Sequence, residues 1–302
     1  MKFKNEIFGV IIKRLTQRYA VTKNVKAGHH RLRGSLPVGG GEMSERSSRL
    51  RYAIIAIAVF SIAEFSRYLL FRLGFYRQFW SPLPDPVRWL EQPLRWSVLC
   101  LLGLFLAHRY GPLRAVRAVG LRAPIRVALL FALAATLPML LGFALVGSFN
   151  SELSVVEALF LAGVWPLAEE ILFRGYFFRQ LHRDAGWGFW KAALTTGIVF
   201  GAVHLLNASV QRLPLSGEIG VVAIIGVGGV FYAWLFVRWE DNLWVPFGMH
   251  MFMNLWWEVF AVDETALGTW FANILRLITV VLAIVLTVYG KRIWKSLSKD
   301  KD

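Results

Sequence analysis

The chain has 302 residues, of which 56% are hydrophobic and 15% aromatic, and its formal net charge is +15. A composition this apolar excludes an ordinary soluble domain, and repeated apolar runs of roughly 18 or more residues predict transmembrane helices. The positive charge is concentrated in the tails and in short loops between apolar runs, which indicates membrane topology and not a nucleic-acid partner. The single cysteine, Cys100, excludes an internal disulfide and a zinc site built from several thiolates.

Basic tails precede and follow the apolar part of the chain. Residues 1–51 hold twelve Lys or Arg against three acids and predict a disordered cytoplasmic tail. Met43 shortly precedes the first apolar run and resembles a natural start, so residues 1–42 are alternatively an over-extended beginning. Residues 291–302 predict a second basic cytoplasmic tail. Residues 52–290 between the two tails form the predicted membrane domain.

The apolar runs predict an all-α, polytopic membrane protein with about eight spans. With the N-terminus inside, the predicted inner segments hold 26 Lys or Arg and the outer segments hold 5. The positive-inside rule therefore places both termini in the cytoplasm, and the basic inner face favours a bacterial inner (plasma) membrane. The predicted spans are 52–71, 93–108, 125–148, 155–178, 189–206, 219–237, 243–262 and 270–290.

Glu169, Glu170 and Arg174 lie deep inside the fourth predicted span, where each charge costs a few kcal/mol to insert. Such residues indicate a functional site unless a partner explains them. Glu170 and Arg174 are i,i+4 on one helix face, so they can form an ion pair that lowers the cost of burial. Glu169 is turned by about 100° from Glu170, which leaves it free for another partner.

Partners at a similar depth are found on two other spans. Counted from the predicted inner boundaries, Glu169 and His204 lie about 21 and 20 Å deep, and His250 and Asn254 about 14 and 20 Å. A carboxylate and an imidazole at one depth can hold and deprotonate a water molecule. A histidine and an asparagine at i,i+4 can donate hydrogen bonds to a developing oxyanion. Together these groups predict peptide-bond hydrolysis.

The same residues carry a resemblance to a known family. One motif would be weak, but three occur in order, each on its own predicted span, over about residues 155–258. They resemble the signature motifs of the CPBP (CAAX protease and bacteriocin-processing) family of intramembrane proteases. The three motifs are Glu169-Glu170-x-x-x-Arg174, Phe200-x-x-x-His204 and His250-x-x-x-Asn254.

The resemblance implies a CAAX-protease-like core and a glutamate-dependent intramembrane endopeptidase. It assigns water activation to Glu169 with His204. It assigns the oxyanion hole to His250 with Asn254, while Glu170 and Arg174 support the site. The expected partners are the lipid bilayer and a membrane-anchored or membrane-inserted peptide substrate.

Two other interpretations remain open. Glu169, His204 and His250 are alternatively three zinc ligands that leave an open position. We expect no cofactor, because the chain has no His-Glu-x-x-His helix and asparagine is a poor zinc ligand but a good oxyanion donor. A non-proteolytic scaffold or bacteriocin-immunity protein is the second alternative, in which the polar cluster serves stability or partner binding.

Two features outside the motifs have simpler structural interpretations. Glu64 and Arg67 are i,i+3 in the first span and predict a local ion pair. Gly226, Gly228 and Gly229 stand in an apolar setting, which predicts close helix packing and excludes a phosphate-binding loop.

Overall fold

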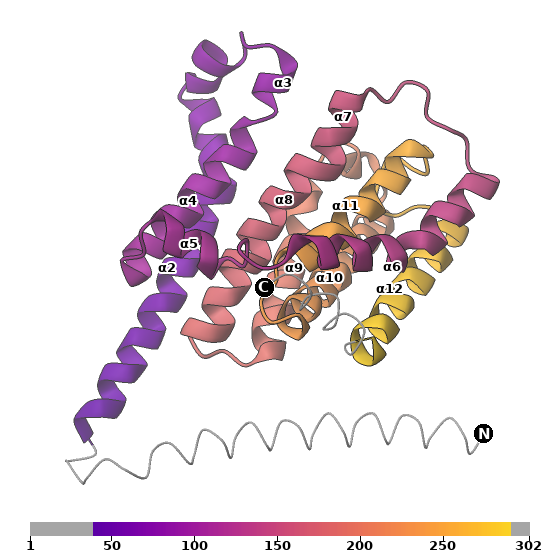
Figure 1. Ribbon diagram of the computed structural model, residues 1–302. Coiled ribbons are helices and arrows are strands. Elements are labelled where there is room, and N and C mark those ends of the chain that lie inside the picture. Colours follow the sequence, from indigo (N-terminus) through magenta and orange to yellow (C-terminus); the bar gives the residue numbers. More distant parts are fainter. Residues whose placement is uncertain (1–38, 291–302) are drawn as a thin grey trace. The chain divides into compact units, whose positions relative to one another are not determined.

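The computed structural model describes residues 39–290, with side chains from residue 45. Within this part of the chain every regular element is a helix. This confirms the all-α fold class (Figure 1). The chain divides into two compact units, residues 1–46 and 47–302, and the description below concerns the second. The longer helices are α2 (Gly39–Arg72), α4 (Glu91–His108), α6 (Ile125–Val146), α9 (Phe189–Val203), α10 (Leu215–Arg238), α11 (Trp244–Val259) and α12 (Trp270–Tyr289).

Short helical elements connect the long ones. A composite helix between residues 155 and 184, described with the site below, lies between α6 and α9. The other short elements are the π-helix η1 (Tyr76–Trp80), α3 (Asp85–Arg88), α5 (Pro112–Ala118) and the 3-10 helices η5 (His204–Leu206) and η6 (Val210–Arg212).

Six of the eight predicted spans are helices long and apolar enough to cross a membrane. The two others, 155–178 and 243–262, do not meet that criterion. The first is divided by π-helical turns, and the second contains α11, which has only 16 residues. Both carry predicted site residues. The qualifying helices are Glu45–Arg72, Asp85–His108, Ile125–Val146, Phe189–Leu206, Leu215–Arg238 and Trp270–Tyr289.

The first span begins earlier in the structure than in the sequence prediction. α2 starts at Gly39, so residues 39–51, assigned above to the basic tail, are helical. Residues 1–38 and 291–302, which hold the rest of the two predicted tails, lie outside the described residues.

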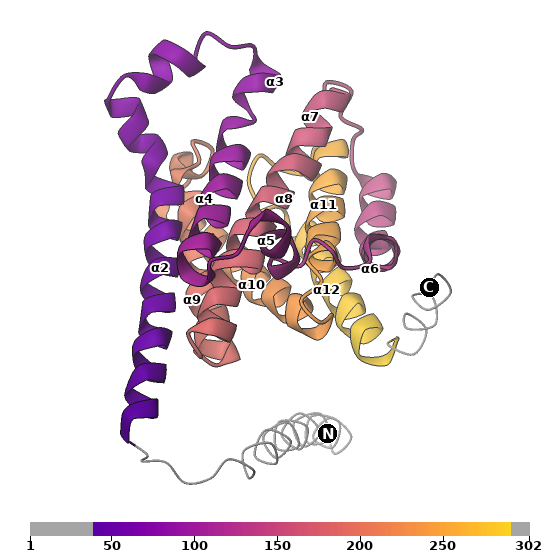
Figure 2. The same cartoon turned by 60° about the vertical axis from the view of Figure 1, so that its left-hand side comes forward.

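α2 and α4 form an antiparallel pair (Figure 2). The pair is joined by the Trp96 indole, whose Nε1 donates to the carbonyl oxygen of Ala63 (3.1 Å). Phe60 of α2 stacks on Phe177 of the composite helix, with ring centroids 4.4 Å apart. The pair therefore packs against the helix that carries the first motif.

Glycines let α9 and α10 approach each other closely, as predicted for this part of the chain. A Cβ at Gly197 would lie 2.7 Å from the carbonyl oxygen of Gly226, and one at Gly201 would lie 2.3 Å from that of Val222. Such backbone contact is available only to small residues. Gly228, in contrast, faces open space. The interface fixes the end of α9, which carries His204.

α6 packs against both α11 and α12 (Figure 1). Gly248 of α11 meets Ala132 of α6, where a Cβ would lie only 2.9 Å from the alanine Cβ. At Gly142 of α6 an added Cβ would lie 2.4 Å from Leu275 of α12. These contacts hold α11, which carries the third motif, on the side of α6.

Candidate active site

The first motif lies on a composite helix with unusually wide turns. Ser154 starts the helix with a capping box, in which its Oγ accepts from the Glu157 N–H (3.2 Å) and the Glu157 carboxylate accepts from the Ser154 N–H (2.9 Å). π-helical turns are frequent at functional sites, and here they flank the two adjacent glutamates. The elements are α7 (Val155–Leu159), η2 (Phe160–Val164), α8 (Trp165–Glu170), η3 (Ile171–Phe178) and η4 (Gln180–Asp184).

Pro166 explains why Asn254 contacts the composite helix. The Trp165 N–H donates to the carbonyl oxygen of Phe160, five residues earlier. The matching donor for Leu161 would be residue 166, but proline has no N–H. The Leu161 carbonyl oxygen accepts instead from Nδ2 of Asn254 (3.3 Å). Asn254 thereby ties α11 to η2.

Glu170 and Arg174 form the ion pair that their spacing predicts. Nη1 of Arg174 lies 3.0 Å from Oε1 of Glu170, and both side chains are buried, at 2% and 0% exposure. The guanidinium carbon lies 4.3 Å from the ring centroid of Phe200 and 5.1 Å from that of Tyr232. These ring faces add cation–π attraction, which is strongest where the cation is desolvated. The charges are thus partly compensated by the pair and the rings, while Oε2 of Glu170 and Nη2 of Arg174 have no hydrogen-bond partner among the described residues.

His250 lies between the two adjacent carboxylates. Its Nδ1 is 3.0 Å from Oε1 of Glu170, and its Nε2 is 3.6 Å from Oε2 of Glu169. Since Glu170 is also paired with Arg174, its carboxylate is the acceptor that holds the Nδ1 proton of His250. Nε2 then faces Glu169, whose side chain remains 21% exposed. The structure therefore brings the first and third motifs into direct contact.

His204 lies at the junction of α9 and η5, and its imidazole is oriented by a contact with the backbone of α9. Its Nδ1 is 2.7 Å from the carbonyl oxygen of Phe200, so Nδ1 donates and Nε2 is left for another partner. The Phe200 ring packs edge-on against both histidines, 5.0 Å from His204 and 6.2 Å from His250. Within the described residues, Glu169 makes its ion-pair contact under 4.0 Å with His250 and not with His204.

Glu64 is a further carboxylate near this site that the sequence analysis assigned differently. Its Oε1 is buried without a hydrogen-bond partner among the described residues, and it interacts electrostatically with Arg95 and Glu169. The expected Glu64–Arg67 pair is wrong. Arg67 instead donates to the side chains of Gln92 and Tyr76, each at 3.5 Å. The general cost of an intramembrane carboxylate was the signal that could have marked Glu64.

Tyr232 of α10 is the other neighbour that sequence reasoning missed. Its ring centroid lies 5.4 Å from that of His250, and its hydroxyl donates to the sulfur of Met253 (3.5 Å). A tyrosine in an apolar helix carries no spacing signal that would point to a site on α11. Only the packing of α10 against α11 shows that Tyr232 lies beside His250.

The residues of the zinc alternative do not gather around one point. Among residues 39–290, no group of three or more His, Cys, Asp or Glu side chains is placed to hold a metal ion. The Phe200 ring lies 5.0 Å from the His204 ring and 6.2 Å from the His250 ring, and no ion-pair contact joins His204 to Glu169 among the described residues. In this structure the three side chains are not grouped as metal ligands, and the zinc alternative stays a proposal that metal analysis tests.

The comparisons with known proteins agree with the motifs. Residues 150–256 match the family model described as type II CAAX prenyl endopeptidase Rce1-like. This segment is Rce1-like. The match confirms the expected resemblance to the CAAX-protease family, and all six predicted site residues fall inside it. No curated protein and no solved structure matches the chain.

The Rce1-like segment also contains the predicted span 155–178 and most of the predicted span 243–262, up to residue 256. These are the two spans that do not meet the criterion for crossing a membrane. The family match therefore covers both of these segments together with the long helices α9 and α10. The membrane setting and the CAAX-protease class rest on that match together with the six long apolar helices.

Proposed function

We propose that this protein is an intramembrane endopeptidase that hydrolyses a peptide bond of a membrane-anchored or membrane-inserted substrate. The observation that supports this most strongly is the 3.6 Å approach of Glu169 to His250, inside an Rce1-like segment. A partly exposed carboxylate beside an imidazole whose other nitrogen is already fixed suits proton transfer to and from water. A purely structural pair would gain nothing from leaving the carboxylate accessible.

In the proposed reaction Glu169 is the general base. It removes a proton from a water molecule, and the resulting hydroxide attacks the carbonyl carbon of the scissile peptide bond. Nε2 of His204 is free to orient that water, because Nδ1 is engaged by the Phe200 carbonyl. When the tetrahedral intermediate collapses, the C–N bond breaks and Glu169 returns its proton to the leaving amine.

His250 and Asn254 are the proposed oxyanion donors. An asparagine amide has two N–H groups, so the bond from Asn254 to the Leu161 carbonyl leaves one of them for the oxyanion. His250 donates from Nε2 when both of its nitrogens carry protons, with the Nδ1 proton held by Glu170. Removing one such donor typically lowers kcat by about 10²–10³-fold.

The reaction as proposed needs no metal ion. Metal analysis of the purified protein, together with cleavage assays before and after a chelator, tests this directly. Unchanged cleavage in metal-free protein is the expected result. Activity that disappears with the chelator and returns with Zn²⁺ would replace this mechanism with the zinc alternative.

A proteome comparison tests the proposed function when the substrate is unknown. Membranes of cells that produce the wild-type protein, Glu169→Gln or Glu152→Gln are compared for new peptide termini. Glu152 is an exposed carboxylate on a predicted outer loop, so its replacement controls for the charge change. Termini should appear with wild type and Glu152→Gln and be missing with Glu169→Gln. A cellular function that Glu169→Gln leaves intact would favour the non-proteolytic scaffold.

A further inference from the structure

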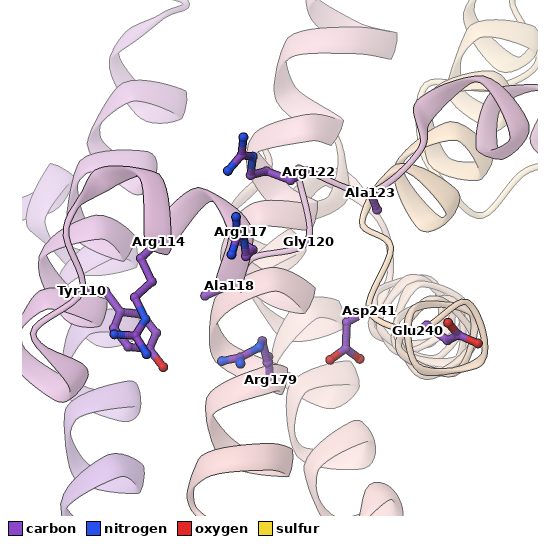
Figure 3. A pocket seen from close by; sticks show the side chains of 10 residues that line it. All are labelled: Tyr110, Arg114, Arg117, Ala118, Gly120, Arg122, Ala123, Arg179, Glu240 and Asp241. Carbon is purple, nitrogen blue, oxygen red and sulfur yellow. The ribbon is translucent and has the colours of Figure 1, made fainter. Parts of the chain in front are cut away.

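Three segments that the charge pattern places on the cytoplasmic side meet around an open pocket of about 520 Å³. They are α5 with the connections on either side of it, the composite helix at Arg179 between η3 and η4, and the turn between α10 and α11. Figure 3 shows the side chains that line the pocket. Its charged lining consists of Arg114, Arg117, Arg122, Arg179, Glu240 and Asp241.

The backbone around the pocket is fixed by specific contacts. Gly120 has a φ of +89°, and a Cβ there would lie 2.1 Å from the carbonyl oxygen of Asp241, so the two loops touch directly. The Trp244 indole Nε1 donates to the Leu121 carbonyl oxygen (3.0 Å), and Nδ2 of Asn242 donates to that of Pro124 (3.1 Å). Arg122, between Gly120 and Pro124, is therefore held on a defined loop, while Arg114 and Arg117 lie on the adjoining helix α5.

The acids of the pocket do not cancel its positive charge. Asp241 is paired with Arg183, which lies outside the lining, at 3.0 Å. In the view of Figure 3 the Glu240 carboxylate points away from the arginines. Within the described residues, the guanidinium groups of Arg117 and Arg122 have no hydrogen-bond or ion-pair partner. An excess of unpaired guanidinium charge therefore faces the pocket.

The other two arginines are oriented by their neighbours. Arg179 pairs with Asp184 at 3.1 Å, and Arg114 lies over the Tyr110 ring at 4.5 Å. A guanidinium stacked on a ring keeps its outer N–H groups available, and its planar fork suits two oxygens of one phosphate. The chemistry of the pocket thus favours a phosphate-bearing anion.

The surroundings indicate where that phosphate comes from. Leu113 of α5 stands beside the arginines and is 77% exposed, and Ile125 at the start of α6 is 40% exposed. Exposed apolar side chains next to guanidinium groups match the boundary between acyl chains and headgroups. We propose that this pocket binds the phosphate headgroup of an anionic membrane lipid at the cytoplasmic surface.

Lipid binding by the full chain tests the proposal independently of proteolysis. Detergent-purified protein is titrated with phosphatidylglycerol or phosphatidylcholine, and bound lipid is counted by native mass spectrometry. Phosphatidylglycerol should bind in preference, and Arg117→Gln/Arg122→Gln should weaken it by about 30-fold, since each Arg near an anionic surface contributes about 1 kcal/mol. Glu169→Gln should bind the lipid as wild type does, whether or not the protein is a protease.

A matched control separates a defined site from general charge attraction. Arg72→Gln/Arg77→Gln removes the same charge from two exposed arginines on predicted outer segments and should leave lipid binding unchanged. Equal losses in the two double variants would overturn the proposal. Competition by millimolar inorganic phosphate would also overturn it, because the site would then hold a free anion. If the glutamine variant does not fold, Arg117→Lys/Arg122→Lys replaces it, because lysine keeps the charge but lacks the planar guanidinium fork. Wild-type lipid affinity in the lysine variant would contradict the proposed recognition of phosphate by the guanidinium groups.

Discussion

Arg174 has its charge balanced by a single carboxylate, and both groups are buried. Arg174→Gln would leave Glu170 buried and without its cation, and breaking a buried pair on one side typically costs about 3–5 kcal/mol. The Glu170→Gln/Arg174→Gln double variant should cost clearly less, since neither charge is then left alone. Denaturant unfolding in detergent micelles measures both. A double variant as unstable as the sum of the two single variants would argue against pairing as the reason for burial.

Local spacing was enough to predict the Glu170–Arg174 pair, since both groups are on one helix face. It was not enough for the Glu169–His250 contact, because that contact depends on how α11 approaches the composite helix. The sequence analysis matched Glu169 with His204 from their similar depth. Depth gives a residue's position along the membrane normal, but not the direction in which its side chain points.

At the scale of elements, the π-helical turn before the first motif lies beside Pro166, which has no N–H to donate to the Leu161 carbonyl oxygen. Pro166→Ala restores an N–H that competes with Asn254 for the Leu161 carbonyl oxygen. A regular turn would also rotate Glu169 relative to α11, and small misplacements of reacting groups cost about 100-fold in rate. We therefore expect a loss of cleavage of that order in a folded protein.

Pro138 provides the control for this experiment, because it stands inside α6 and makes none of the contacts described for the site. Pro138→Ala should keep wild-type cleavage even where thermal stability changes. Wild-type activity in Pro166→Ala would show that the wide turn is not required to position the glutamates.

The α9–α10 interface depends on the absence of side chains at particular glycines. Gly201→Ala would place a Cβ 2.3 Å from a backbone oxygen, and such overpacking typically costs about 1–3 kcal/mol. Gly228→Ala meets open space and should be neutral or slightly stabilising, by about 0.5–1 kcal/mol in a helix. Thermal unfolding in detergent compares the two. Equal effects would mean that helix propensity and not backbone contact determines stability here.

Hydropathy located the long helices, although α2 begins at Gly39 and the predicted span at residue 52, and it did not reveal the π-helical turns. A π turn changes hydrogen-bond partners without changing which residues are apolar, so the periodicity of the run carries little trace of it. Pro166 was the one local sign.

For the whole molecule, the charge distribution predicts which loops face the cytoplasm. In a Cys100→Ala background, Ser151→Cys lies on a predicted outer loop and Leu113→Cys on a predicted inner one, and both positions are exposed. A membrane-impermeant maleimide added to intact cells should label only Ser151→Cys. After permeabilisation it should label both. The opposite pattern would invert the topology and place the arginine pocket on the outer face.

The fold class, the six long apolar helices and the family resemblance were all predictable from the sequence, because composition, charge and motif order determine them. The arginine pocket was not predictable, although residues 108–126 and 179–191 were recognisably basic. Its existence depends on the contact between Gly120 and the α10–α11 turn, which joins residues far apart in the chain.

Cleavage by the purified protein in lipid nanodiscs tests the central claim most directly. A substrate recovered from the proteome comparison is incubated with wild type, Glu169→Gln and Glu152→Gln, and the rate at which the new peptide terminus forms is measured. The account predicts a rate about 10²–10⁴-fold lower for Glu169→Gln, as expected for the loss of a general base, and no change for Glu152→Gln. Cleavage by Glu169→Gln at the wild-type rate would contradict it.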